Sequence, residues 1–530
     1  MVRQVAAPVL GSLGWSSMVA LAPIVVLFLL LGVFGWRAER AAGAALAAAL
    51  LVAVGAYGVG VGPALDMAAL GALFGLVSVA WVILNALWIY DVTLRSGHFE
   101  ALRHAFARAG GPKPVQVLLI AYGFGGLLEG LIGAGAPVAI CGAMLVAAGI
   151  APLEAAVCAL IADSVPVAFG TLALPIVALA SATGLPLDPL GAMVGRQTPL
   201  LAALVPFILL FLVGGRRALG EHFGVALLAG IAFGGTQFAV SNYVSVRLAD
   251  VVAALVASAA IVGVARAPRG AAGIRTPESG EGRQTALALA PYGLIIVVFA
   301  AAQWTPVARL LRRSRVAFDW PGLHVGLPDG TRVPTSFRVD LLGTTGTLLL
   351  LAGLLAVATL RVPLRVAWRS YCDTALGIGG AVLTVMAIFA LAFVANLSGQ
   401  TRTMGLLLTG LGPVGFALAS PLIGWIGSAL TGSDSSSNVL FGGLQIVAAK
   451  GVGIPPLLAA ASNSSGGVVA KAISVQSLAV ASATVSLVGQ EAAILRRVIG
   501  WSMLLLALMC GLSLVQSLPP VARFIVPGVR

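Results

Sequence analysis

Hydrophobic residues occur along this chain in long blocks that are separated by short polar connections. Many blocks approach or reach the ~20 residues that cross a bilayer as a helix. Their pattern predicts an all-α polytopic membrane protein with about 12–14 membrane segments. The uninterrupted blocks are Met18–Trp36, Ala41–Gly62, Ala68–Tyr90, Gly224–Tyr243, Val251–Val264, Ala286–Ala302, Leu341–Leu360, Ala375–Val394 and Val498–Leu518.

Two further apolar tracts are interrupted near their middle by a single carboxylate. Glu129 is the only charged residue in Val115–Gly149, and Asp434 is the only charged residue in Gly412–Ala449. A carboxylate in hydrocarbon costs several kcal/mol, so such a segment needs protein or a water-filled cavity around it. We therefore predict re-entrant or broken helices near residues 124–140 and 428–440. For the second stretch, an extramembrane loop between two spans is the alternative.

The interruptions form a pattern that occurs once in each half of the chain. A polar knot follows each interrupted tract, at Asp163-Ser164 and at Asn463-Ser464-Ser465. Paired interruptions of this kind indicate a transporter whose site lies between repeats, although glycine-rich membrane proteins also produce such patterns by chance. The predicted organisation is two repeats, residues 1–267 and 341–530. Between them, residues 268–340 form a linker with one span and an extramembrane segment, and the polar stretch Arg266–Arg283 marks the boundary.

Composition agrees with a membrane protein and narrows the partners. Of 530 residues, 59% are hydrophobic and only 9% are charged, against roughly 25% charged in soluble domains. The net charge of +13 comes from basic residues in the connections, which is typical of topology signals and lipid contact rather than of nucleic-acid binding. The four cysteines lack metal-ligand spacing, so we expect no metal and no cofactor. Basic clusters on both sides of Ala286–Ala302 leave the topology around 286–340 open.

Five motifs carry a resemblance to a known family: FGGLLEGLIGAGAPVAI (Phe124–Ile140), PVAFG (Pro166–Gly170), MVGRQ (Met193–Gln197), LTGSDSSSN (Leu430–Asn438) and NSSGGVVAKAISVQS (Asn463–Ser477). They closely resemble the bacterial L-lactate permease family, and the resemblance runs from about Met18 to the last span. It implies an inner-membrane, multi-pass secondary transporter that imports L-lactate and related 2-hydroxy-monocarboxylates (D-lactate, glycolate) with protons. It also implies two inverted repeats with re-entrant hairpins, as in the ion-transporter group in which this family is placed. The family pattern has Asn where this chain has Asp163 and Pro where it has Val475, so an extra carboxylate stands near the site.

A lactate-type substrate needs an anion receptor and a group that takes up a proton. Glu129, Asp434 and Asp163 are the candidates for proton coupling, although Glu129 also fits a purely structural carboxylate and Asp434 a sodium ligand. Free N–H groups at helix breaks and nearby hydroxyls bind anions. Lys471 is the one cation in its tract, and it fits either the substrate carboxylate or a structural pair with Asp434 or Glu129. The substrate-binding candidates are Gly133, Gly135, Ala136, Pro137, Ser433, Ser435, Asn438, Asn463, Ser464, Ser465 and Lys471.

Other classes fit less well. An intramembrane aspartyl protease would need a glycine-x-glycine-Asp partner for Tyr90-Asp91, and Gly432-Ser433-Asp434 does not supply it. The paired interruptions argue against a passive channel, and we expect no enzyme activity. The main alternative is a sodium-coupled transporter, or a transporter of another organic anion, from the ion-transporter group to which the resembled family belongs. The sequence predicts the lipid bilayer, a small monocarboxylate and protons as partners, and it leaves a homodimer open.

Overall fold

The computed structural model describes residues 2–109, 111–133, 135–265, 281–327, 332–333 and 335–528. Most of the predicted polar linker 266–283 lies outside the described residues. Within them, twelve helical segments are long and apolar enough to cross a bilayer, or up to thirteen if one bent pair is a single span. The predicted all-α polytopic fold is confirmed, with a few short strands added outside the helices. The inverted relation between the two halves stays a prediction.

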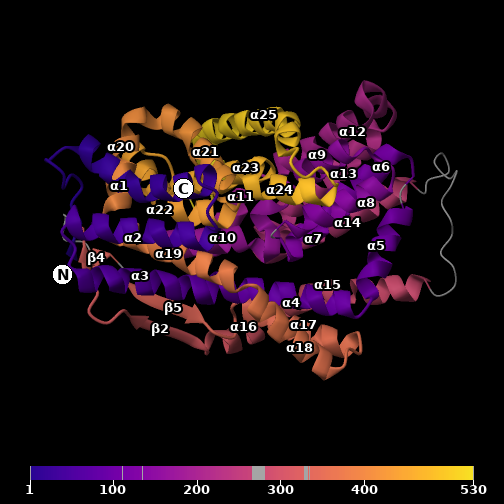
Figure 1. Ribbon diagram of the computed structural model, residues 1–530, viewed down its shortest axis with the longest axis horizontal. Helices are drawn as coiled ribbons and strands as arrows, with labels where there is room; N and C mark the ends of the chain where they lie inside the picture. Colours follow the sequence, from indigo (N-terminus) through magenta and orange to yellow (C-terminus); the bar gives the residue numbers. More distant parts are fainter. Residues whose placement is uncertain are drawn as a thin grey trace.

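The N-terminal helices form one side of the molecule. A continuous helical segment of 35 residues runs from Val61 to Arg95, and Figure 1 shows its two parts, α3 and α4, end to end. Its first part packs against α19, where Gly71 faces the backbone of Ala390, and its second part packs against α17. The elements are β1 (Val2–Arg3), α1 (Leu13–Phe28), η1 (Leu29–Val33), α2 (Ala38–Gly55), α3 (Val61–Gly75), η2 (Leu76–Ala80), α4 (Trp81–Arg95) and α5 (His98–Ala109).

The first predicted interruption is a real break. The helix ends at Leu131, and the chain resumes as a helix at Ala136. A second break follows, where two apolar helices meet at a bend of 59°. The elements are α6 (Lys113–Val117), η3 (Leu118–Phe124), α7 (Gly125–Leu131), α8 (Ala136–Ala147), α9 (Pro152–Asp163), η4 (Val167–Phe169), α10 (Gly170–Thr183), α11 (Leu187–Val194), α12 (Pro199–Glu221), α13 (Phe223–Tyr243), η5 (Val246–Leu248) and α14 (Ala249–Ala265).

The predicted extramembrane segment forms two small sheets after one span. Strands β2 and β5 pair antiparallel with Phe318 opposite Phe337, while β3 lies between β4 and the N-terminal strand β1. The N-terminus and this segment therefore lie at the same end of the molecule (Figure 1). The elements are α15 (Glu281–Gln303), α16 (Thr305–Arg312), β2 (Arg315–Asp319), β3 (Val325–Gly326), β4 (Arg332–Val333) and β5 (Ser336–Asp340).

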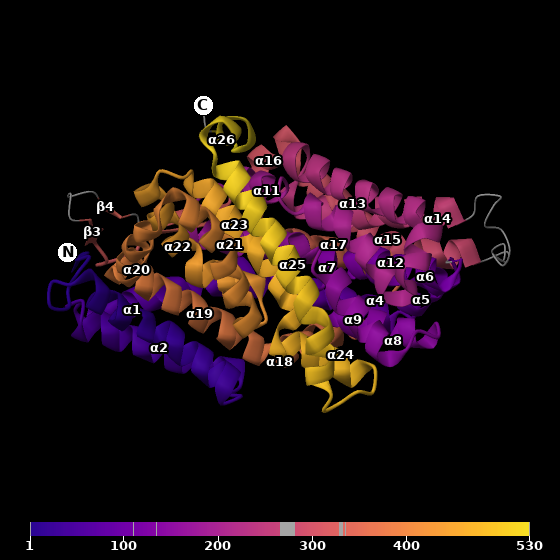
Figure 2. The ribbon, with the colours of Figure 1, turned by 90° about the horizontal axis from the view of Figure 1, so that it is seen from above.

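The C-terminal part contains the second interrupted tract. Helix α25 crosses diagonally over α21 and α23 (Figure 2). Helices α21 and α23 pack at backbone distance, because a Cβ at Gly466 would collide with the Pro421 carbonyl group and one at Gly424 with that of Asn463. The elements are α17 (Thr345–Thr359), α18 (Leu364–Gly377), α19 (Gly379–Ser398), α20 (Gln400–Leu408), η6 (Thr409–Leu411), α21 (Gly412–Thr431), α22 (Asp434–Val452), α23 (Pro456–Ala470), η7 (Lys471–Ile473), α24 (Val475–Thr484), α25 (Glu491–Ser517) and α26 (Pro519–Ile525).

One predicted span is shorter in the structure. The span predicted at Leu341–Leu360 is a helix of only 15 residues, because Thr344 caps its N-terminus by accepting a hydrogen bond from the N–H of Thr347. The polar knot at Asn463–Ser465 lies inside helix α23. This helix ends at Ala470, five residues after Ser465, and the short turn η7 begins at Lys471.

Candidate functional site

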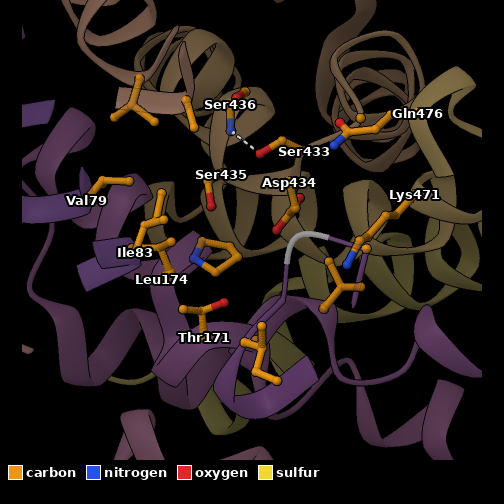
Figure 3. A pocket seen from close by; sticks show the side chains of 18 of the residues that line it. Val79, Ile83, Thr171, Leu174, Ser433, Asp434, Ser435, Ser436, Lys471 and Gln476 are labelled. Atoms are coloured by element: carbon orange, nitrogen blue, oxygen red, sulfur yellow. Dashed lines mark hydrogen bonds between the residues drawn. The ribbon is translucent and has the colours of Figure 1, made fainter. Parts of the chain in front are cut away.

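The two interrupted tracts meet at one cavity of about 240 Å³ (Figure 3). Gly135 from the first break lines it, and so does the segment 432–436 from the second. Glu129 and Lys471 line it as well. Residues that lie about 300 positions apart in the sequence therefore line a single cavity.

Glycines shape the first break. Gly133 and Gly135 adopt positive φ angles of +62° and +81°, which favour glycine because a Cβ is strained there. Gly133 has a second constraint, because a Cβ would collide with Oγ1 of Thr171 and come within 3.6 Å of Oε1 of Glu129. Gly135 caps the N-terminus of α8, and Pro137 lies in its first turn. The break thus brings a helix N-terminus to the cavity.

The second break brings another helix N-terminus to the same cavity. Gly432 ends α21 with a φ of +73°, and the side chain of Ser433 caps α22 by accepting a hydrogen bond from the N–H of Ser436. Asp434 is the first residue of α22, and the first intrahelical bond of the turn runs from Ser437 N–H to Ser433 O. The N–H groups of Asp434 and Ser435 precede that bond, at the positive end of the helix dipole.

Glu129 and Lys471, which line the cavity, form a buried ion triad with Asp163 behind them. Lys471 Nζ donates a hydrogen bond to Glu129 Oε1 at 2.6 Å and lies 3.1 Å from Asp163 Oδ2. The side chains are only 8%, 4% and 4% exposed, respectively. Glu129 Oε2 and Asp163 Oδ1 are buried and have no hydrogen-bond partner among the described residues. One ammonium therefore serves two carboxyl groups, and each carboxyl keeps one oxygen unsatisfied.

Asp434 is held differently, by neutral donors. Its Oδ2 accepts hydrogen bonds from Ser464 Oγ at 2.8 Å and Asn438 Nδ2 at 3.1 Å, and its Oδ1 lies 3.4 Å from Ser428 Oγ. Gly467 approaches so closely that a Cβ there would collide with Asp434 Oδ1. Among the described residues, Lys471 forms ion pairs with Glu129 and Asp163 and none with Asp434. Of the two structural partners that the sequence offered for Lys471, Glu129 is therefore the one found.

A layer of buried amides and hydroxyls supports this arrangement. Asn438 also donates to the Pro175 carbonyl group at 3.2 Å and accepts from Asn463 Nδ2 at 2.9 Å. Ser465 donates to Gln197 Oε1 at 2.7 Å, which connects α23 to the loop between α11 and α12. These residues satisfy one another across helices, which explains why the polar knot at 463–465 remains helical.

The predicted site residues divide into two groups. Glu129, Gly135, Ser433, Asp434, Ser435 and Lys471 line the cavity. The others do not line it: Asp163 contacts Lys471, Gly133 packs against Thr171, Ala136 and Pro137 begin α8, and Asn438, Asn463, Ser464 and Ser465 form the buried layer.

Sequence reasoning missed a left-handed turn beside the triad. Thr171, Leu172 and Ala173 have φ angles of +47°, +57° and +62°, although none is glycine, and all three are buried. Each such residue costs roughly 1–2 kcal/mol, so the surrounding structure must hold the turn in place. Thr171 lines the cavity, and Gly170 packs against Glu129. The motif PVAFG directly precedes this turn, but it served only for the family resemblance and did not indicate the backbone conformation that follows.

Sequence reasoning also missed a fully buried carboxyl group. Asp250 Oδ1 accepts a hydrogen bond from Gln237 Nε2 at 2.7 Å, and Oδ2 has no partner among the described residues. It lies against Gly130, the residue after Glu129. Its position directly before an apolar block suggested a span end instead. Among the described residues, no group of three or more His, Cys, Asp or Glu side chains could hold a metal ion.

Comparison with known proteins gives consistent matches along nearly the whole chain. The sequence model of the L-lactate permease family matches residues 16–518. The chain is 35% identical to the glycolate permease GlcA of Escherichia coli K12 and 34% identical to an L-lactate permease of Bacillus subtilis 168. Each alignment covers 96% of this chain and 97% of the relative. Among solved structures it is similar to the YdaH transporter of Alcanivorax borkumensis, with 17% identity, a TM-score of 0.43 and coverage of 84% and 86%.

Proposed function

The chain belongs to the L-lactate permease family, a family of multi-pass proteins of the bacterial inner membrane, and from this premise we propose that it imports L-lactate and related 2-hydroxy-monocarboxylates by proton symport. The related substrates are D-lactate and glycolate. The observation that carries the proposal is the Lys471 ammonium held between Glu129 and Asp163 inside the cavity. The protein acts as a carrier in this proposal, and no chemical conversion of the substrate is involved.

Charge explains why a proton should accompany the substrate. Lactate is an anion at neutral pH, and moving one negative charge against an inside-negative potential costs roughly 2.3 kcal/mol per 100 mV. A proton that travels with the anion removes this cost. When all are ionised, the three carboxylates of Glu129, Asp163 and Asp434 outnumber the one ammonium of Lys471. The excess negative charge then repels the lactate anion.

The triad supplies a coupling step. While Glu129 and Asp163 are both ionised, they engage Lys471 and compete with a substrate carboxylate for it. A proton that adds to one of these carboxylates weakens its hold, so Lys471 becomes available to the substrate. When the proton leaves on the cytoplasmic side, the restored carboxylate retakes Lys471 and favours substrate release.

The rest of the anion receptor consists of helix N-termini and hydroxyls. The first N–H groups of α22 and the side chains of Ser433 and Ser435 face the cavity beside Asp434, and Gly135 brings the start of α8 to it. Helix N-termini bind carboxylates through free N–H groups and the helix dipole. These groups bind the substrate carboxylate together with Lys471.

Uptake of labelled L-lactate into proteoliposomes tests the proposal. With the membrane potential clamped, an inward proton gradient should drive accumulation. Glu129→Gln should abolish this proton-driven accumulation while counterflow between lactate pools persists, because an amide cannot take up and release the proton. Glu154→Gln, on an exposed glutamate at the start of α9, is the matched control and should behave as the unmodified protein.

The same vesicles separate the alternatives. Accumulation that depends on a sodium gradient and not on the proton gradient would support the sodium-coupled alternative and refute proton symport. Absence of both uptake and counterflow for every 2-hydroxy acid would refute the substrate assignment.

A further inference from the structure

The cavity has two unlike walls. One wall carries Lys471, Asp434 and Ser433, as described above. The facing wall is apolar, and aliphatic except for Phe389, so we call it the aliphatic wall. It comes from the α3–α4 segment and α19, which the motifs do not include. Figure 3 shows Val79 and Ile83 across the cavity from Asp434 and Lys471. The apolar residues that line the cavity from these helices are Val79, Ile83, Leu87, Ala381, Val385, Ile388 and Phe389.

We propose that this aliphatic wall binds the alkyl group at C2 of the substrate, so that the transporter accepts linear 2-hydroxy acids longer than lactate. The inference rests on the proposed function and deepens it. Glycolate has no carbon at this position and lactate has one methyl group. Such small substituents cannot cover a wall of seven side chains, and 2-hydroxybutyrate and 2-hydroxyvalerate extend further along it.

Burial and size support this assignment. Val79, Ile388 and Phe389 are at most 4% exposed, so this part of the wall is packed inside the protein. Ile83, Leu87 and Val385 are partly exposed and Ala381 is exposed, so these side chains keep apolar surface that a ligand can cover. The cavity volume of about 240 Å³ also exceeds what a six-heavy-atom acid requires, since one water molecule takes ~30 Å³ in the liquid. An aliphatic wall left in contact with water favours a ligand that covers it.

Each added methylene group should then improve binding. Burying one CH₂ group is worth roughly a fourfold change in affinity. A competition series against uptake of labelled L-lactate in proteoliposomes measures this directly. The inhibition constants should fall about fourfold per carbon from glycolate through L-lactate to 2-hydroxybutyrate and 2-hydroxyvalerate, under one fixed proton gradient.

Two substitutions on the wall should change this series in opposite directions. Ala381→Leu fills space near the exposed edge of the cavity, and the ratio of the inhibition constants of 2-hydroxyvalerate and glycolate should rise about tenfold. Ile83→Ala removes three carbons, and the optimum should move to an acid one or two carbons longer. Leu383→Phe is the control, because Leu383 lies on the same helix as Ala381 but is 59% exposed and does not line the cavity. Its ratio should stay within twofold of the unmodified protein.

The outcomes distinguish this inference from the proposed function. Inhibition constants that rise from L-lactate onward in the unmodified protein, or wall substitutions that change all four acids equally, would overturn the inference while leaving lactate transport intact. If neither glycolate nor lactate is carried or competes, the proposed function itself is wrong. Size-exclusion profiles of each variant in detergent show that a changed ratio comes from folded protein.

Discussion

Lys471 Nζ lies 2.6 Å from Glu129 Oε1, although the two residues are separated by 342 positions in the chain. The pair joins α7, which ends at the first break, to η7, which follows the second interrupted tract. Asp163 adds a second carboxylate to the same ammonium. Four expectations follow from this cluster and the packing around it.

Removing the ammonium of Lys471 should destabilise the protein, and removing the charges of Lys471, Glu129 and Asp163 together should restore its stability. Breaking a buried ion pair from one side costs roughly 3–5 kcal/mol, whereas replacing all partners with neutral groups is often neutral. Lys471→Met should therefore lower the melting temperature in detergent at pH 8, and the loss should shrink as the pH is lowered, because a protonated carboxyl group does not need a cation beside it. The triple variant Lys471→Met, Glu129→Gln, Asp163→Asn should recover the stability but not the transport. If Lys471→Met alone were as stable as the unmodified protein at pH 8, this prediction would be wrong.

Asp163→Asn should move the pH dependence of lactate uptake to lower pH. The substitution removes a negative neighbour of Glu129 and leaves Lys471 to Glu129 alone, so adding a proton to Glu129 becomes harder. Initial uptake rates measured with equal pH inside and outside should show a midpoint roughly one pH unit lower. Asp188→Asn, on an exposed residue in the first turn of α11, should leave the midpoint unchanged. An unshifted midpoint in Asp163→Asn would mean that Asp163 does not influence proton uptake.

Gly467→Ala should impair both folding and uptake. The added Cβ collides with Asp434 Oδ1 and lies 2.7 Å from Ser428 Oγ, so it displaces the carboxylate from its donors. Overpacking of this kind costs about 1–3 kcal/mol. The control is Gly235→Ala in α13, where nothing lies within 4 Å of the new Cβ and the better helix propensity should stabilise by up to about 1 kcal/mol. Thermal unfolding and lactate counterflow of the two variants should therefore differ in sign, and equal effects would contradict the contact.

Asp250→Asn should be tolerated or stabilising. The amide keeps the oxygen that accepts from Gln237, and burying an amide costs far less than burying an unpaired charge. Asp250→Ala should cost about 1–3 kcal/mol, because it leaves the Gln237 amide unsatisfied. Melting temperatures and proton-driven uptake decide the matter. Loss of proton-driven uptake in Asp250→Asn, with the fold intact, would show that this carboxyl group takes part in coupling.

The sequence predicted the broken segments well, because their signals are local. Glycines and Pro137 after Glu129 disfavour an unbroken helix, and Gly432 together with the polar run around Asp434 does the same in the second tract. The polar knot at Asn463–Ser465 remains helical for a physical reason that the local sequence does not reveal. Asn463 and Ser465 in α23 form hydrogen bonds with Asn438 in α22 and with Gln197 in the loop before α12. A local sequence pattern does not reveal which helices will be neighbours and supply these partners.

The aliphatic wall and the shared ammonium could not be fully predicted for a similar reason. Val79 and Ile83 look like any lipid-facing or core residue in a span, since hydrophobicity alone does not say which face meets a cavity. Lys471 had several carboxylates as possible partners, and only the folded arrangement selects Glu129 and Asp163 over Asp434.

The backbone contact between α21 and α23 also restricts how the transporter can move. Gly424 and Gly466 lock these helices together, so they translate and rotate as one body, and the ammonium that follows α23 is carried with them. Glu129 and Asp163 lie on α7 and α9 instead, so these two helices can separate from α23 only after both ion pairs to Lys471 have broken. Under the proposed proton symport, a proton on either carboxylate would therefore lower the cost of that separation.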